Sequence, residues 1–360
     1  RIVAAPIIIG TYLQLVIVPY NLNLVHNVKV PGSMLDISFL SGLSIVIMVL
    51  ILIIIFWKKY PVLVFGLTWL FLFILPSSNI IPIPIPLLEH RLYLPMIGFA
   101  ICISALLHQF TNMSRFKKII HYFATLTIVL YGLLSFIRLP VWASTETIWN
   151  DEIQCNPDND LQYYNLGTYY VSKSQYVKGI EYLEKATRTN RKKKDVLQNL
   201  GFAYTQLNRF EDAAHAYERA IQIDPTSAAT CLGLGNAYRS MKRYSDASRI
   251  YQEGLRRNPY LVPLHYEFGL LCGTMRNDSL AEIELKKAIS LDNKYAPAYF
   301  SLGAMYSYQK KDSEAITFIN EGMKYQTPSA DMYYVLGKSY YNTGDTLKSK
   351  YFHNIYRSLR

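Results

Sequence analysis

Hydrophobic and polar positions divide this chain of 360 residues into two halves with different patterns. In residues 1–150, long apolar runs alternate with short polar connections, whereas residues 151–360 mix apolar and charged positions throughout. A helix needs roughly 20 mostly apolar residues to cross a bilayer. Five runs qualify, at about residues 2–20, 38–57, 62–80, 92–110 and 119–138. The pattern predicts an all-α chain in which a bundle of about five transmembrane helices precedes a water-soluble domain.

The second half repeats itself every 34 residues. Each repeat has a glycine after a large apolar residue, usually a tyrosine three positions later, and a small residue twelve positions after the glycine. The glycines are Gly167, Gly201, Gly235, Gly269, Gly303 and Gly337. This period and pattern are typical of the tetratricopeptide repeat, a helix-turn-helix unit that stacks into an α-solenoid. We expect a transmembrane domain over 1–140, a linker helix over 141–159 and six repeats over 160–360.

Tetratricopeptide solenoids bind partners in a groove that is lined by the first helix of each repeat. We expect this groove to be formed by the positions one and four residues after each glycine, together with their neighbours. The candidates are Gln206, Asn236, Arg239, Tyr266, Tyr308, Tyr334, Lys338 and Asn342. These side chains are aromatic and polar with little charge, which favours a protein, an extended peptide or a glycan over an acidic tail as the bound partner. The alternative is that much of this surface is simply solvated.

Charge is distributed as unevenly as hydrophobicity. Residues 1–150 carry nine of the 37 Lys and Arg residues and three of the 26 Asp and Glu residues. Basic residues mark the cytoplasmic ends of membrane helices, and here they cluster in two connections, at Lys58, Lys59, Arg115, Lys117 and Lys118. This topology predicts an integral membrane protein whose repeat domain is extracytoplasmic, either periplasmic or lumenal. The net charge of +11 is therefore interpreted as a topology signal, and no nucleic-acid partner is expected.

The expected outer loops carry the unusual chemistry of the membrane half. Alternating prolines over 76–86 exclude a lipid-exposed helix there. Glu89, His90 and Arg91 follow directly. A guanidinium group matches phosphate oxygens in a fork, so Arg91, with His90, is a candidate site for the phosphate of a lipid-linked donor. Glu89 is a weak catalytic candidate, and the alternative is a Glu89–Arg91 ion pair that only fixes the loop. Asp36 is expected to cap a helix.

Four cysteines, at positions 102, 155, 231 and 272, have no metal-ligand spacing. We interpret them as small buried apolar residues and expect no metal site and no cofactor. The chain begins at Arg1 without the features of a signal peptide, so we expect it to be a piece of a longer protein.

Several short motifs resemble a known family. They are the junctions 138–149, 155–159 and 164–167, the segment 89–95 and the loop 19–24. Together they resemble the C-terminal portion of the transmembrane and tetratricopeptide-repeat O-mannosyltransferases and their bacterial relatives, which are polytopic GT-C glycosyltransferases. The resemblance implies inverting transfer of a sugar, typically mannose, from a polyprenyl-phosphate donor to a hydroxyl acceptor, often Ser or Thr of a protein. It also implies an acidic catalytic base upstream of this chain, so that no catalytic base is assigned here.

Two functions therefore remain open. The leading hypothesis is a glycosyltransferase portion that binds the polyprenyl-phosphate sugar and recruits the acceptor through the extracytoplasmic repeats. The alternative is a non-catalytic, membrane-anchored repeat scaffold for an extracytoplasmic protein assembly.

Overall fold

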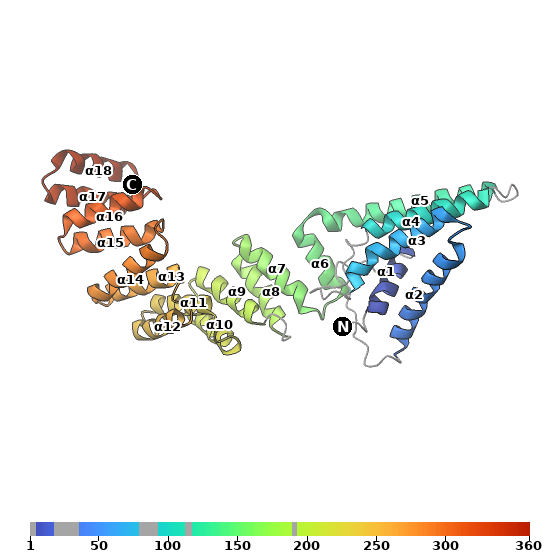
Figure 1. Cartoon of the computed structure of the whole chain (residues 1–360). Helices are drawn as coiled ribbons and strands as arrows, with labels where there is room; N and C mark the ends of the chain where they lie inside the picture. The colour runs from blue at the N-terminus through green and yellow to red at the C-terminus, as the bar shows by residue number, and fades with distance from the viewer. Residues whose placement is uncertain (1–4, 18–35, 79–92, 112–116, 189–192) are drawn as a thin grey trace. The chain divides into compact units, whose positions relative to one another are not determined.

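The computed structural model describes residues 5–17, 36–78, 93–111, 117–188 and 193–360, and no strand occurs within these ranges. The chain divides into two compact units, Arg1–Gln162 and Tyr163–Arg360. All regular structure in the described residues is helical, as the hydrophobic pattern predicts (Figure 1).

The first unit contains helices at all five expected places. They are α1 (Ala5–Ile17), α2 (Ile37–Phe56), α3 (Pro61–Ile74), α4 (Tyr93–Thr111) and α5 (Lys117–Arg138), with 3-10 turns η2 (Leu75–Ser78) and η4 (Leu139–Ala143). Only two segments of the described chain, Phe39–Phe56 and Ala124–Ala143, are long and apolar enough to cross a membrane. Helix α3 has 14 residues, which at 1.5 Å per residue covers about 21 Å. Two of the five expected spans therefore have the length and composition of a membrane helix in the described residues, and the bundle of five spans is not confirmed.

Small residues bring the helices of the first unit close together. A Cβ atom on Gly98 of α4 would lie 2.6 Å from the carbonyl oxygen of Gly66 in α3, and a Cβ on Gly66 would lie 2.7 Å from Sγ of Cys102. Helices α1 and α2 meet in the same way at Gly42. Close backbone approach through small residues is the usual packing mode of helices in membranes.

Helix α6 (Thr145–Cys155) follows α5 and η4. Ser144 caps α6, and Arg138 at the end of α5 forms a bidentate ion pair with Asp151 of α6, with N–O distances of 2.9 and 2.8 Å. Because both side chains are half-buried, this pair fixes the direction in which the chain leaves the apolar helices.

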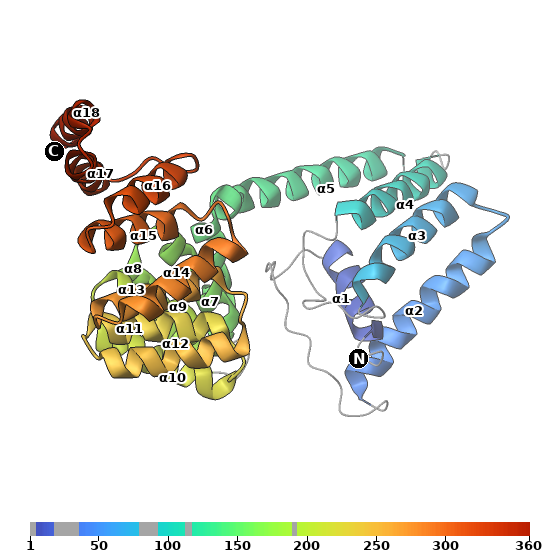
Figure 2. The same cartoon turned by 60° about the vertical axis from the view of Figure 1, so that its left-hand side comes forward.

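Twelve further helices form six pairs in the repeat region (Figures 1 and 2). The pairs are α7 (Asp160–Ser172) with α8 (Tyr176–Lys185), α9 (Lys193–Gln206) with α10 (Phe210–Ile223), α11 (Ala228–Ser240) with α12 (Tyr244–Arg257), α13 (Val262–Thr274) with α14 (Asp278–Leu291), α15 (Ala296–Tyr308) with α16 (Asp312–Met323), and α17 (Ala330–Asn342) with α18 (Thr346–Ser358). A short 3-10 turn, η5 (Ala186–Arg188), follows α8.

Packing explains the residues that recur every 34 positions. A Cβ atom on Gly201 would lie 2.7 Å from the ring of Tyr217, and one on Gly167 would lie 2.7 Å from Leu183, so the two helices of a repeat touch where the first has no side chain. The small residues twelve positions later are fully buried at the same crossing: Ala213, Ala247, Ala281 and Ala315. The turns recur too, because a residue with positive φ follows the first helix of each repeat: Ser174, Asn208, Lys242, Arg276, Lys310 and Gly344.

Candidate functional site: the inner face of the repeats

The first helices of successive repeats pack against one another. Helix α9 contacts α11, α11 contacts α13, α13 contacts α15, and α15 contacts α17. In a superhelix of helix pairs, the row of helices that pack against their counterparts in the next repeat lines the inner, concave side. These first helices, α9, α11, α13, α15 and α17, are labelled in Figure 2, and we call their exposed surface the inner face.

A polar network occupies the middle of the inner face. Beneath this face, the fully buried Tyr251 of α12 donates a hydrogen bond from its hydroxyl to Asn236 Oδ1. One turn further along α11, Arg239 Nη2 lies 2.9 Å from Glu267 Oε2 on α13. Burial raises the pKa of Glu267, and the Arg239 guanidinium opposes part of this rise. Burial also raises the pKa of Tyr251, so its hydroxyl is a proton donor at all ordinary pH values.

Exposed tyrosines dominate the later repeats. Tyr308 is 70% exposed, Tyr341 is 67% exposed and Tyr334 is 46% exposed. Arg276 Nη1 donates to the Tyr308 hydroxyl at 2.7 Å, and the guanidinium lies 5.6 Å from the centre of the ring. Gly273 leaves a cavity of about 290 Å³ beside this pair. The face therefore offers flat aromatic surface next to a cation.

The remaining predicted residues are divided between solvent and repeat packing. Gln206 ends α9 and Lys338 lies on α17, and both are exposed. Tyr266 is half-buried and packs edge-on against Tyr295, with ring centres 5.4 Å apart. Asn342 Nδ2 donates to Asp312 Oδ2 at 3.1 Å, so this side chain joins two repeats.

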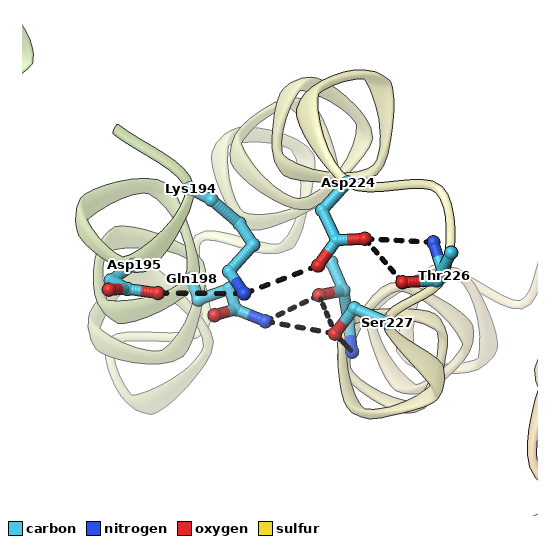
Figure 3. Close-up of polar contacts among 7 residues, drawn as sticks. Lys194, Asp195, Gln198, Asp224, Thr226 and Ser227 are labelled. Carbon is cyan, nitrogen blue, oxygen red and sulfur yellow. Dashed lines mark hydrogen bonds and ion pairs between the residues drawn. The ribbon is translucent and has the colours of Figure 1, made fainter. Parts of the chain in front are cut away.

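A second polar cluster joins the starts of α9 and α11 (Figure 3). Lys194 Nζ lies 3.2 Å from Asp224 Oδ2, and Gln198 Nε2 donates to the hydroxyls of Ser227, at 3.3 Å, and Thr230. Ser227 caps α11 by accepting from the backbone N–H of Thr230. Because every member is used for capping or for the contact between repeats, this cluster stabilises the stack and leaves the inner face as the candidate site.

His265 of α13 is 7% exposed. Its Nδ1 lies 2.6 Å from Glu284 Oε2, and its Nε2 lies 2.9 Å from the carbonyl oxygen of Pro259. Burial alone lowers the pKa of His265, but hydrogen bonds to these two acceptors outweigh it, and the pKa is raised above 6.5. Both partners accept hydrogen bonds, so the doubly protonated ring fits this place best.

Sequence reasoning missed Glu267, Tyr251 and Arg276. A comparison of the repeats could have found Glu267, because the residues two positions before the glycines are otherwise Asn165, Asn199, Gly233, Ser301 and Val335, all uncharged. Tyr251 and Arg276 carry a weaker signal, since one belongs to a second helix and the other to a turn.

The candidate donor-binding residues Glu89, His90 and Arg91 lie outside the described residues. Asp36 immediately precedes α2, and its carbonyl oxygen accepts from Leu40 N at 3.0 Å, which is the position of a helix cap. Within the described parts of the chain, no group of three or more His, Cys, Asp or Glu side chains could hold a metal ion.

Three family models of the tetratricopeptide repeat match the chain, over residues 163–193, 195–227 and 230–259. Among curated proteins, the chain is 25% identical over 114 residues to the protein O-mannosyl-transferase TMTC3 of Homo sapiens and of Mus musculus. The match covers 31% of this chain and only 12% of the length of those relatives.

Two solved structures share the fold. PilF of Pseudomonas aeruginosa has a TM-score of 0.51 at 15% identity, over 56% of this chain and 91% of its own. PilW, a type IV pilus biogenesis factor, has a TM-score of 0.51 at 16% identity, over 55% of this chain and 92% of its own. The 34-residue period, the six helix pairs and the family models agree, and the chain contains a tetratricopeptide-repeat domain.

Proposed function

We propose that the inner face of the repeats binds an extended segment of a protein, and that the chain is the acceptor-recruiting part of an integral-membrane glycosyltransferase. Tetratricopeptide solenoids use their concave surface for binding. The observation that carries the proposal is the presence of exposed tyrosines on α15 and α17, where Tyr308 and Tyr341 are 70% and 67% exposed. Tyrosine is enriched among the residues that dominate binding energy at interfaces.

The spacing of the repeats suits an extended chain. Packed helices lie about 8–10 Å apart, and an extended peptide advances about 3.3 Å per residue. About three peptide residues therefore pass each repeat. The polar network of Arg239, Glu267 and Asn236 would hydrogen-bond to the backbone, and the tyrosines would pack against side chains. Such recognition tolerates many sequences, as an enzyme that modifies many proteins requires.

We further propose that the membrane portion transfers a sugar. It is supported by the resemblance at the membrane junctions and by the partial match to protein O-mannosyl-transferase TMTC3. In this proposal Arg91 and His90 hold the phosphate of a polyprenyl-phosphate sugar, Glu89 orients Arg91, and the repeats lie on the extracytoplasmic side. Arg91→Ala should abolish transfer from a polyprenyl-phosphate mannose donor in the full protein. Unchanged turnover would remove Arg91 from the donor site.

A non-catalytic scaffold is the second candidate. It is favoured by the finding that only Phe39–Phe56 and Ala124–Ala143, among the described residues, are long and apolar enough to cross a membrane, because two spans suffice for an anchor. A scaffold would bind its partner on the same inner face but would give no sugar transfer under any donor condition.

Two tyrosines provide a matched test of the binding site. Tyr341 is 67% exposed on α17, the first helix of its repeat, and Tyr351 is 61% exposed on α18, the second helix. Tyr341→Ala should weaken binding of an unfolded, fluorescently labelled polypeptide about tenfold, which corresponds to about 1.4 kcal/mol. Tyr351→Ala should leave the affinity unchanged. Equal affinities for the two variants would contradict binding on the inner face.

A further inference from the structure

A cavity of about 650 Å³ lies where the turn after α2, the start of α3 and the last two turns of α4 meet. This volume is within the range of about 300–1,000 Å³ that is typical of ligand sites. None of the candidate donor residues is among its lining residues, and the cavity is not part of the inner face of the repeats.

The lining of the cavity is amphipathic. Apolar side chains, among them Phe56, Leu63 and Leu106, share it with the polar side chains of Lys59, His108 and Gln109. A ligand that fits both parts has an apolar portion and a polar or charged head. Phospholipids have this construction, and they are the amphipathic molecules that surround a membrane helix.

The position of the cavity also indicates a lipid. Lys59 follows the 20-residue helix α2, whose apolar window Phe39–Phe56 is only 11% buried within the protein. If α2 crosses the membrane, Lys59 lies at the level of the lipid headgroups. The neighbouring Trp57 is 64% exposed, and tryptophan is enriched at this level of the bilayer. The exposed apolar surface of α2 and the cavity therefore meet the same lipid layer.

The positive charge beside the cavity favours a lipid with an anionic headgroup. The Lys59 ammonium lies 5.3 Å from the centre of the Tyr60 ring, and none of the ion pairs found among the described residues involves Lys59. Lys58 adds a second positive charge next to it. None of the described residues that line the cavity is acidic. A basic pocket between membrane helices attracts an anionic headgroup.

We propose that this cavity binds one anionic glycerophospholipid, with its phosphate at Lys59 and the upper part of its acyl chains against Phe56, Leu63 and Leu106. The bound lipid would fill the cavity between the end of α2, the start of α3 and the end of α4. The proposal requires that α2 crosses the membrane and does not depend on sugar transfer.

Native mass spectrometry of the full chain in a neutral detergent tests the proposal. The wild-type protein should retain palmitoyl-oleoyl phosphatidylglycerol about fivefold more than the phosphatidylcholine with the same chains. Lys59→Gln should remove this preference. Lys118→Gln removes one positive charge at another connection, on α5, and should keep it. Glycerol 3-phosphate at the same concentration should not bind, which separates a lipid from a free phosphate.

A second variant tests the apolar part of the cavity without changing its charge. Ala105 lines the cavity, and Ala105→Leu should reduce retention of both lipids while the protein remains monodisperse in size-exclusion chromatography. Equal retention of the two lipids by the wild type would overturn the proposal. The same loss in Lys118→Gln as in Lys59→Gln, or binding of glycerol 3-phosphate alone, would also overturn it.

Discussion

The buried histidine of the fourth repeat should make the repeat domain lose stability as the pH rises. His265 has Glu284 Oε2 at 2.6 Å and the Pro259 carbonyl oxygen at 2.9 Å on opposite ring nitrogens. Its pKa in the folded state is raised above the unfolded value near 6.5. A group with a raised folded pKa stabilises the folded state fully below the unfolded pKa, and this contribution is lost as the pH rises through the folded pKa.

His265→Gln measures this contribution. Glutamine is neutral at every pH, and its amide cannot reproduce both hydrogen bonds of the imidazolium. A hydrogen bond to a charged group is worth about 1.5–3 kcal/mol, so the variant should be about 2–3 kcal/mol less stable than the wild type near pH 5.5. Above the folded pKa the neutral ring turns a lone pair toward one of the two acceptors, and the difference should shrink to about 1 kcal/mol or less.

The assay is urea unfolding of residues 157–360, followed by far-ultraviolet circular dichroism at pH values from about 5.5 to 9. His215→Gln is the control, because the His215 side chain is 80% exposed, and it should change the free energy of unfolding by less than about 0.5 kcal/mol. A His265→Gln effect that is independent of pH, or that grows as the pH rises, would show that the charged His265 ring does not stabilise the fold.

Further predictions concern the backbone and the junction. Gly344 has φ +88°, so Gly344→Ala should destabilise the repeat domain by about 1 kcal/mol in urea unfolding; an unchanged midpoint would contradict the strain argument. Gly273→Ala should stabilise the repeat domain by about 0.5 kcal/mol, because alanine is favoured over glycine inside a helix. The new Cβ has room, since its nearest neighbour is Ala281 Cβ at 3.9 Å. A loss of stability would show that the new methyl group does not fit. Asp151→Asn should weaken the contact between α5 and α6 by about 1.5–3 kcal/mol, measured as faster hydrogen exchange in α6, and unchanged exchange would rule out a role for the Arg138 ion pair.

The repeat architecture could be predicted from sequence because packing demands specific residues at fixed positions. Only glycine leaves room for the Tyr217 ring against Gly201, and the 34-residue period follows from this crossing. The membrane half was predicted less completely. Apolar runs mark where helices form, but they do not mark where each helix ends. Helix α3 ends at Ile74 because Pro76 follows at the second position of a 3-10 turn. The helix therefore has 14 residues and is shorter than the predicted span over 62–80.

The sequence predicts which positions lie on the inner face, but it does not predict the hydrogen bonds and ion pairs that these residues form. The register of the repeats places Asn236 and Arg239 on the first helix, because both follow Gly235 at fixed distances. The partners of Asn236 and Arg239 lie on other helices, and the 34-residue period does not show which side chains meet there. Glu267 comes from the next repeat, and the buried Tyr251 reaches Asn236 from a second helix because Gly235 leaves space for its ring.

We propose that the inner face of the repeats recruits the acceptor for sugar transfer by the membrane portion. The most direct measurement is the rate of mannose transfer from a polyprenyl-phosphate donor to an unfolded protein acceptor by the full protein and its Tyr341→Ala and Tyr351→Ala variants. We expect Tyr341→Ala to raise KM for the acceptor about tenfold with little change in kcat, and Tyr351→Ala to behave like the wild type. No transfer by the wild type, or equal KM values for the two variants, would contradict it.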